Sequence, residues 1–135
     1  MVPLQIRVIY GDTDQAGIVY YANYLRYFEA GRTEFLRAKG LRYRDVEASF
    51  HLRLPVAEAE VQYKAPALYE DLLTVETSLT EARRASVGFG YRVHREGALV
   101  ATGRTRHACV DLDGRIQRMP PELLAAISRG EEPVR

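Results

Sequence analysis

The sequence has few of the features that mark secreted, membrane-bound or nucleic-acid-binding proteins. Cys109 is the single cysteine among 135 residues, so no disulfide can form within the chain and a reducing compartment is expected. No run approaches the roughly 20 apolar residues of a membrane span, and the first residues do not resemble a signal peptide. The formal net charge is +1, which indicates no bulk attraction to nucleic acid or membrane. We therefore expect a cytoplasmic protein.

Several common catalytic and cofactor-binding patterns are also missing. The three histidines, His51, His94 and His107, are scattered without the spacing of metal ligands. Ser86 and Ser128 lack the sequence context of a nucleophile elbow, and neither a GxGxxG motif nor a P-loop is present. The sequence therefore predicts no metal, no cofactor and no serine triad.

Apolar patterning predicts five strands and one long helix. The predicted strands cover residues 4–10, 55–64, 72–80, 87–93 and 98–110. Because four of them follow one another after the helix, the order predicts a single α+β domain over residues 1–135, with a five-stranded antiparallel sheet packed on that helix. Such a sheet has edges and a second face to protect, which favours a dimer.

The most distinctive stretch is a polar, glycine-containing loop that runs into the long helix. Asn23 suits the N-cap position, and Gly40 suits the position just past the helix end. One helical stripe is apolar, and Leu25, Leu36 and Ala38 are predicted to widen it. The stripe, at spacings of four, three and four, consists of Tyr24, Phe28, Gly31 and Phe35.

The loop before the helix carries two carboxylates. Asp12 is interpreted as a structural residue, because aspartates in glycine-containing turns commonly hydrogen-bond the local backbone. Asp14 can be interpreted in two ways. It can be a structural turn residue like Asp12, or it can be a catalytic carboxylate that lies beside the unpaired backbone N–H groups of the helix N-terminus. Acyl transfer needs such a pairing, because one group attacks or activates water while the other stabilises the oxyanion.

Three other features of the sequence, which involve four residues, have an ordinary structural interpretation. Arg83 and Arg84 form a charged turn, which is usually a solvated hairpin, but adjacent arginines can also clamp phosphate oxygens. Glu29 lies on the helix after an aromatic pair and would ordinarily be a surface residue. Cys109 lies in a strand pattern and is predicted to be a small core residue.

Residues 11–24 read Gly-Asp-x-Asp-x-Ala-Gly-Ile-Val-Tyr-Tyr-x-Asn-Tyr. This run closely resembles the signature of the 4-hydroxybenzoyl-CoA thioesterase family of hotdog-fold acyl-CoA thioesterases. Residues 63–73, 81–86 and 113–120 support the resemblance, which covers nearly the whole chain. It implies a hotdog fold, in which a long central helix is wrapped by the sheet. It also implies a homodimer that joins the two sheets, a homotetramer made of two such dimers, and active sites at the dimer interface.

The resemblance assigns roles to residues of the loop. Asp14 matches the catalytic carboxylate, which acts as a nucleophile or as a general base on water. Tyr21 matches the position that donates its backbone N–H to the thioester oxygen. Gly17 and Tyr20 match residues that shape the turn between them.

Further roles concern the substrate. Arg83 and Arg84 match residues that contact the nucleotide phosphates of CoA in the hydroxybenzoyl branch. Glu29 falls where an acidic residue reads the ring hydroxyl in that branch. The chain has glutamate there instead of aspartate, and Tyr21 where the Tol-Pal-associated thioesterases of the family have histidine. A single residue does not assign a substrate, so the acyl group stays open.

The sequence thus predicts an acyl-CoA thioesterase that acts without a metal or redox cofactor and whose partners are acyl-CoA and further copies of the chain. A non-catalytic hotdog module that binds acyl-CoA is the alternative. A hotdog dehydratase ranks lower, because no histidine lies near Asp14 in the sequence.

Overall fold

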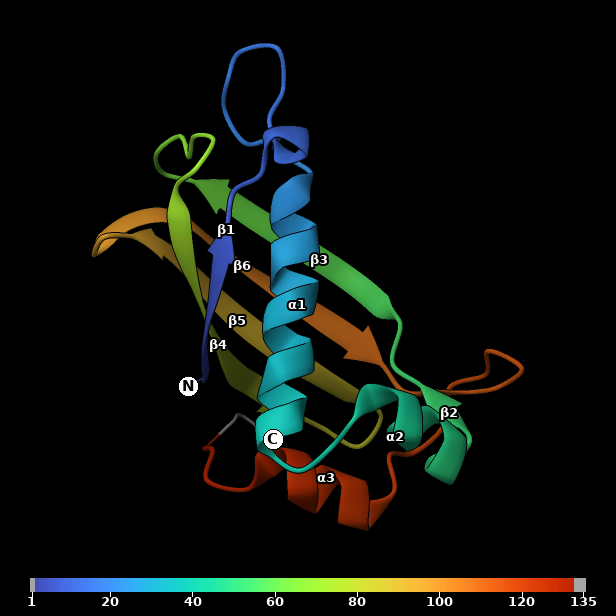
Figure 1. Cartoon of the computed structure of the whole chain (residues 1–135). Helices are drawn as coiled ribbons and strands as arrows, with labels where there is room; N and C mark the ends of the chain where they lie inside the picture. The colour runs from blue at the N-terminus through green and yellow to red at the C-terminus, as the bar shows by residue number, and fades with distance from the viewer. Residues whose placement is uncertain (1, 133–135) are drawn as a thin grey trace.

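The computed structural model describes residues 2–132 and consists of a curved antiparallel sheet wrapped around one long helix, α1 (Figure 1). The five strands pair in the order β1-β4-β5-β6-β3, and every pairing is antiparallel. In that order their bounds are Val2–Arg7, Leu72–Ala82, Ser86–Arg95, Ala98–Ala108 and Val56–Tyr63. The predicted α+β architecture is therefore confirmed.

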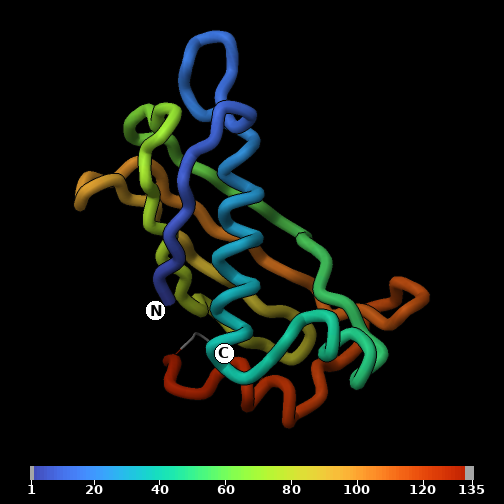
Figure 2. The backbone as a smooth tube through the Cα atoms, viewed as in Figure 1, coloured from blue at the N-terminus to red at the C-terminus, as the bar shows by residue number. Residues whose placement is uncertain are grey.

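The remaining elements lie at the two ends of α1 (Asn23–Ala38) (Figure 2). At its N-terminal end lie a long loop and a 3-10 turn, η1 (Tyr10–Asp12). At its C-terminal end lie α2 (Tyr43–Phe50), α3 (Pro121–Ser128) and a two-stranded sheet of β2 (Leu52–Arg53) and β7 (Val110–Asp111). Among the helices of residues 2–132, none has the length and apolar content needed to cross a membrane.

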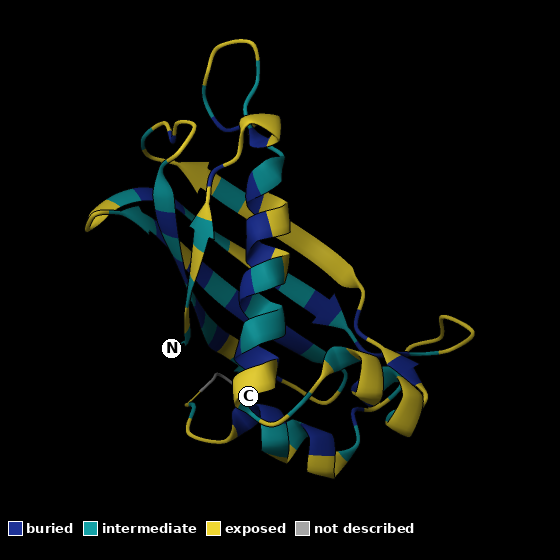
Figure 3. Ribbon diagram, in the orientation of Figure 1, coloured by how far each residue is buried: buried dark blue, intermediate teal, exposed yellow. Residues whose placement is uncertain are grey.

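The predicted apolar stripe of α1 faces the sheet and is buried (Figure 3). Phe28 stacks on Tyr91 of β5, with ring centroids 4.3 Å apart and planes inclined by 3°. Of the residues predicted to widen the stripe, Leu36 is buried, whereas Leu25 and Ala38 are exposed. The buried residues of α1 are Tyr24, Tyr27, Phe28, Gly31, Phe35 and Leu36.

The two ends of α1 form differently from one another. Gly40, with φ +80°, follows the last turn, and the N–H groups of Gly40 and Leu41 donate to the carbonyls of Arg37 and Leu36 at 3.0 and 2.9 Å. This is a Schellman motif, so the predicted helix end is confirmed. The predicted N-cap is wrong, because Asn23 is already helical and its amide donates to the carbonyl of Asp12 at 2.8 Å. The Asn23 side chain therefore binds a carbonyl of the preceding loop instead of a backbone N–H of the first helical turn.

Glycine at two positions lets α1 and the sheet approach closely. A Cβ atom on Gly31 would lie 2.5 Å from Oγ1 of Thr77 on β4. A Cβ atom on Gly103 of β6 would lie 2.3 Å from the Phe28 ring and 2.6 Å from the Glu60 carbonyl oxygen. Both distances are shorter than van der Waals contact, so a side chain at either position would push the helix off the sheet.

The edge strand β3 departs from the half-buried pattern that alternation predicts. Its residues are exposed on both faces except Val61, which is half-buried (Figure 3). A register shift between Val56 and Glu58 interrupts its pairing with β6. The predicted first strand also ends earlier than expected, since Tyr10 lies in η1 and is 77% exposed. An exposed edge strand is a surface on which another strand can pair.

The close approach at Gly103 yields a stability prediction. Gly103→Ala is expected to lower the free energy of unfolding by roughly 2 to 3 kcal/mol, because its methyl group overlaps the Phe28 ring and a strand carbonyl. Gly11→Ala is the matched control, since a Cβ there has nothing within 4 Å. Urea unfolding of both variants measures the difference. Equal stability of the two variants would contradict the packing described here.

Candidate active site

Asp14 lies in a tight hairpin loop between η1 and α1. Its backbone N–H donates to Ile18 at 2.9 Å, and its carbonyl accepts from Gly17 at 3.0 Å. Gly17 has φ +83°, a conformation that favours glycine. The Oδ1 atom of Asp14 accepts from the N–H of Ala16 at 2.9 Å, whereas Oδ2 accepts from no other residue within 2–132. The loop therefore orients the carboxylate and leaves one oxygen available.

Asp12 has the structural role that the sequence predicts. It is 6% exposed, and its Oδ2 atom accepts from the Ile9 N–H at 3.1 Å and the Tyr27 hydroxyl at 3.0 Å. Its carbonyl accepts from the Tyr20 N–H at 2.9 Å as well as from Asn23. Burial, and next the hydrogen bond to Asp12, raise the pKa of Tyr27. Asp12 thus ties both ends of the loop to α1.

Asp14 lines a cavity of about 490 Å³ at the N-terminal end of α1. The Tyr63 hydroxyl, at the end of β3, donates to the Tyr21 carbonyl at 3.0 Å, and the Tyr63 and Tyr24 rings meet edge to face at 5.5 Å. Burial raises the pKa of Tyr24 to about 12, so this wall is neutral. The cavity is lined by Asp14, Ile18, Val19, Tyr21, Tyr24, Tyr63, Lys64, Ala65 and Pro66.

Asp71 and Arg95 hold the far wall of this cavity in place. The Asp71 Oδ2 atom accepts from the Leu68 N–H at 2.8 Å and from Nη1 of Arg95 at 2.9 Å. The same Arg95 nitrogen donates to the Pro66 carbonyl at 2.8 Å. The hydrogen bonds from Leu68 and Arg95 hold the pKa of the Asp71 carboxyl below its usual value, although desolvation is the largest single influence and acts in the opposite direction. The segment 64–71 is therefore fixed against the Asp14 loop.

Two backbone N–H groups beside the cavity have no acceptor. The residue Ala22 already has helical dihedral angles, φ −70° and ψ −19°, immediately before α1. Within residues 2–132, the N–H groups of Tyr21 and Ala22 donate to no protein acceptor. Such groups at a helix N-terminus carry partial positive charge and attract an anionic oxygen. Asp14 and Tyr21 thus line one cavity, and Ala22 follows Tyr21 at the helix N-terminus.

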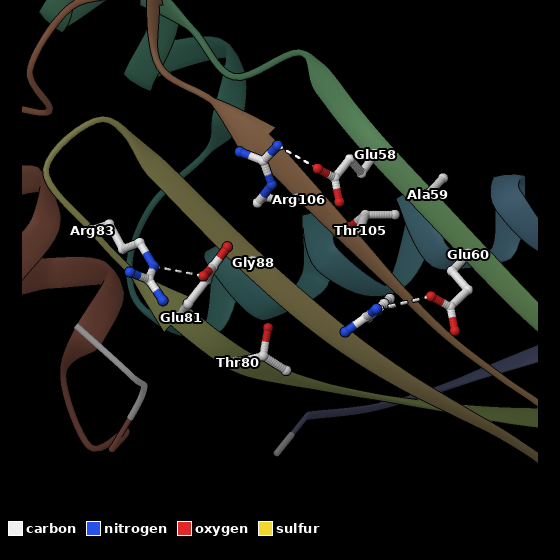
Figure 4. Close-up of a pocket in the computed structure, with 10 residues that line it drawn as sticks. Glu58, Ala59, Glu60, Thr80, Glu81, Arg83, Gly88, Thr105 and Arg106 are labelled. Carbon is white, nitrogen blue, oxygen red and sulfur yellow. Dashed lines mark hydrogen bonds and ion pairs between the residues drawn. The ribbon is translucent and has the colours of Figure 1, made fainter.

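Arg83 and Arg84 lie at the opposite end of the molecule. The Arg84 carbonyl accepts from the Met119 N–H just before α3 at 2.8 Å, and the 16 residues of α1 separate the two ends by about 24 Å. Arg83 pairs with Glu81 at 2.7 Å and lines a cavity of about 410 Å³ on the outer face of the sheet (Figure 4). One chain alone does not bring these arginines to Asp14.

Glu29 is likewise apart from Asp14. Its carboxylate is 73% exposed and lies 3.9 Å from Nη2 of Arg32. It lines two cavities between α1 and the start of β3, and Asp14 lines neither of them. Of the predicted site residues, the structure therefore brings only Asp14 and Tyr21 to one cavity, with Gly17 and Tyr20 in the adjoining loop.

Comparison with known proteins shows the family to which the chain belongs. A family model described as the thioesterase-like superfamily matches residues 8–127. The chain belongs to this superfamily. The acyl-CoA thioesterase YbgC of Haemophilus influenzae is 36% identical over 123 residues, which cover 90% of each chain. The 1,4-dihydroxy-2-naphthoyl-CoA hydrolase of Thermosynechococcus vestitus is 32% identical over 124 residues, which cover 90% of this chain and 84% of that protein.

Solved structures agree with this assignment. A mutant of 4-hydroxybenzoyl-CoA thioesterase, crystallised with 4-hydroxybenzoyl-CoA, superposes with a TM-score of 0.85 at 28% identity, covering 94% of this chain and 98% of that one. The resemblance to hotdog-fold acyl-CoA thioesterases that residues 11–24 indicate is confirmed, and so is the hotdog fold.

The sequence patterns do not identify two residues that line the Asp14 cavity. Tyr24 was predicted only as a core residue, and Tyr63 only as a strand residue, although both line the Asp14 cavity. The signal for Tyr63 is the segment Tyr63-Lys64-Ala65-Pro66, which supports the family resemblance. Its position beside Asp14 depends on the pairing of β3 with β6, which one sequence does not specify.

A buried polar chain lies beneath the cavities that Glu29 lines. Since the Leu54 carbonyl can only accept, Nδ1 of His107 donates to it at 3.0 Å. The other ring nitrogen then accepts from the Thr105 hydroxyl at 2.8 Å, and Thr105 accepts from the Tyr91 hydroxyl at 2.6 Å. His107 is 2% exposed, and burial lowers its pKa to about 4. The imidazole is therefore neutral at pH 7.

The neutral His107 predicts a pH dependence of stability. An unfolded histidine binds a proton near pH 6.5, whereas the folded one does so only near pH 4. The stabilisation is present above pH 6.5 and is lost as the pH falls from there to 4, amounting to about 3 kcal/mol. Urea unfolding should show a shallower decline over this range in His107→Gln than in the wild type. Parallel declines would mean that His107 does not stay neutral in the fold.

Proposed function

We propose that the protein is an acyl-CoA thioesterase in which Asp14 is the catalytic carboxylate. The observation that carries this proposal is the shared cavity, which Asp14 and Tyr21 both line, together with the Tyr21 N–H that has no protein acceptor within residues 2–132. A thioester whose carbonyl oxygen accepts from Tyr21 would present its carbonyl carbon to Asp14. Donors fixed before the reaction stabilise the oxyanion without reorganising.

Two routes use this carboxylate. As a general base, Asp14 takes a proton from water while the water oxygen bonds to the carbonyl carbon, and the C–S bond then breaks to release CoA thiolate. As a nucleophile, Asp14 itself bonds to the carbonyl carbon and expels CoA, and water then cleaves the resulting anhydride. Both routes give free acid and CoA, and both place the negative charge of the tetrahedral intermediate at the Tyr21 N–H.

We also propose that the complete site forms between two chains. Tyr63, at one end of β3, lines the Asp14 cavity, and Val56, at the other end, lines the Glu29 cavities. Antiparallel pairing of two β3 strands about a two-fold axis would bring Tyr63 of one chain beside Val56 of the other. The acyl group held at Asp14 would then extend toward Glu29 of the partner. The exposed edge of β3 supports this arrangement.

The position of Arg83 and Arg84 supports a higher assembly in the same way. They lie near the C-terminal end of α1, whereas Asp14 lies before its N-terminal end, and α1 is about 24 Å long. We therefore propose a homotetramer, made of two such dimers, in which these arginines bind the nucleotide of a substrate held by a neighbouring chain. We assign the enzyme to the cytoplasm, in keeping with its lone, buried Cys109.

The role of Asp14 predicts a large loss of activity in Asp14→Asn. We expect kcat to fall by about a thousandfold or more, since a central catalytic group is removed, while thermal unfolding stays close to that of the wild type. The assay is release of free thiol from a panel of aryl-, short- and long-chain acyl-CoAs. Asp45→Asn, in the first turn of α2, makes the same chemical change far from the cavity and should retain full activity. Turnover by Asp14→Asn within tenfold of that control would remove Asp14 from the mechanism.

The role of Arg84 predicts an effect limited to CoA esters. Arg84→Gln is expected to raise KM for an acyl-CoA about tenfold and to change kcat little, because a phosphate contact contributes binding alone. With the acyl-pantetheine thioester, which has no nucleotide, wild type and variant should have the same kinetic constants. An equal loss on both substrates would indicate a structural role for Arg84 instead.

A further inference from the structure

Two adjoining cavities lie between α1 and the start of β3, and Asp14 lines neither of them. Their volumes are about 500 and 300 Å³, and Glu29, Arg32 and Val56 line both. The larger cavity has mostly apolar walls, which include Leu36 and Phe89, above the buried His107. Such a cavity suits an organic group whose polar part is recognised by a few side chains.

Arg32 is the distinctive polar side chain of both cavities. Its side chain is 17% exposed, and its guanidinium lies near the uncharged Tyr91 hydroxyl but makes no hydrogen bond to a carboxylate within residues 2–132. Glu29, 3.9 Å away, is its sole ion-pair partner there, and at 73% exposed it screens the charge weakly. Arg37 offers a comparison on the same helix, since it is 54% exposed and donates to Glu34 at 3.4 Å. Arg32 is thus half-buried and has only a weak ion pair to balance its charge.

The groups that face Arg32 from the sheet do not neutralise it. His107 is neutral and is bonded to Leu54 and Thr105. Tyr91 stays protonated, because burial raises its pKa although Arg32 acts in the opposite direction. Glu29 is the one carboxylate that lines either cavity, within the part of the chain that the structure describes. A guanidinium in such surroundings favours an anionic oxygen, and its planar fork matches a carboxylate.

We propose that Arg32 determines substrate specificity by binding a carboxylate at the end of the acyl group that is remote from the thioester. This inference rests on the proposed thioesterase activity and deepens it. The apolar walls would hold the body of the acyl group, and Arg32 would bind its charged tip. The substrate class is therefore the monothioester of CoA with a dicarboxylic acid, either aromatic or aliphatic.

The pairing of two β3 strands proposed above would give this substrate a path. Val56 lines both Arg32 cavities, and antiparallel pairing would place it beside the Tyr63 that lines the Asp14 cavity of the other chain. Arg32 lines both cavities together with Val56, so it lies on the side of α1 that faces this junction. The thioester and the carboxylate of one substrate would thus contact different chains.

Two matched pairs of substrates test the proposal. They are hexanoyl-CoA with adipoyl-CoA, and benzoyl-CoA with 4-carboxybenzoyl-CoA, with 4-hydroxybenzoyl-CoA as a neutral polar comparison. Wild-type kcat/KM is expected to be at least about tenfold higher for the carboxylated member of a pair. Arg32→Met should lose about ten- to a hundredfold on the carboxylated esters and change by less than about twofold on the uncharged ones. Arg32→Lys should restore part of the loss, because it retains the charge.

Arg37→Met is the matched control, because Arg37 has the same three-residue spacing from a glutamate on α1 and lines neither cavity. It should leave both pairs unchanged. Equal losses on all esters in Arg32→Met would show a structural role and overturn the proposal, as would a wild-type preference for uncharged or hydroxylated acyl groups. In those cases thioesterase activity itself would stand. Failure of the wild type to cleave any ester would overturn the thioesterase assignment and this inference with it.

Discussion

The candidate site depends on the buried hydrogen bonds of one aspartate, Asp12. Its carboxylate accepts from Ile9 before the loop and from Tyr27 one turn into α1, and its carbonyl accepts from Tyr20 and Asn23. These bonds close the loop on the helix that follows it. Loss of this buried acceptor would leave its donors without a partner. By tying the loop to α1, Asp12 fixes the positions of Asp14 and of the Tyr21 N–H.

The rest of the fold places this loop against the sheet. Glycine at positions 31 and 103 lets α1 lie directly on the strands, and Phe28 stacks on Tyr91 between them. Tyr63, on the edge strand, then reaches back to the Tyr21 carbonyl. One chain thus builds a cavity with a carboxylate at one end of α1, and the other residues predicted to bind substrate lie elsewhere. The exposed edge of β3 offers a way to unite them in an assembly.

Much of the fold could be predicted because periodic patterns are local. The alternation in β4 and the helical stripe of α1 both correspond to buried faces, and Gly40 ends the helix as expected. The errors occur where a tertiary contact decides the outcome. Asn23 binds the Asp12 carbonyl instead of capping the helix, and Tyr10 leaves the strand because η1 turns the chain away from the sheet.

The sequence predicted some residues of the candidate site and missed others. Asp14 and Tyr21 are neighbours in the sequence, so a motif could assign them together. Arg32 carried no such signal, because an arginine three residues after a glutamate on a helix is ordinarily a surface ion pair. Its burial follows from the packing of α1 against the start of β3, which depends on contacts distant in sequence. Patterns within one sequence do not contain that information.

The most direct test of the account is a crystal structure of Asp14→Asn with an uncleaved acyl-CoA. We predict that the thioester carbonyl oxygen lies about 3 Å from the backbone nitrogen of Tyr21, with the side chain at position 14 facing the carbonyl carbon. The acyl group should then enter the space between α1 and β3. A thioester bound away from the N-terminal end of α1, with the Tyr21 N–H still unpaired, would contradict the proposed mechanism.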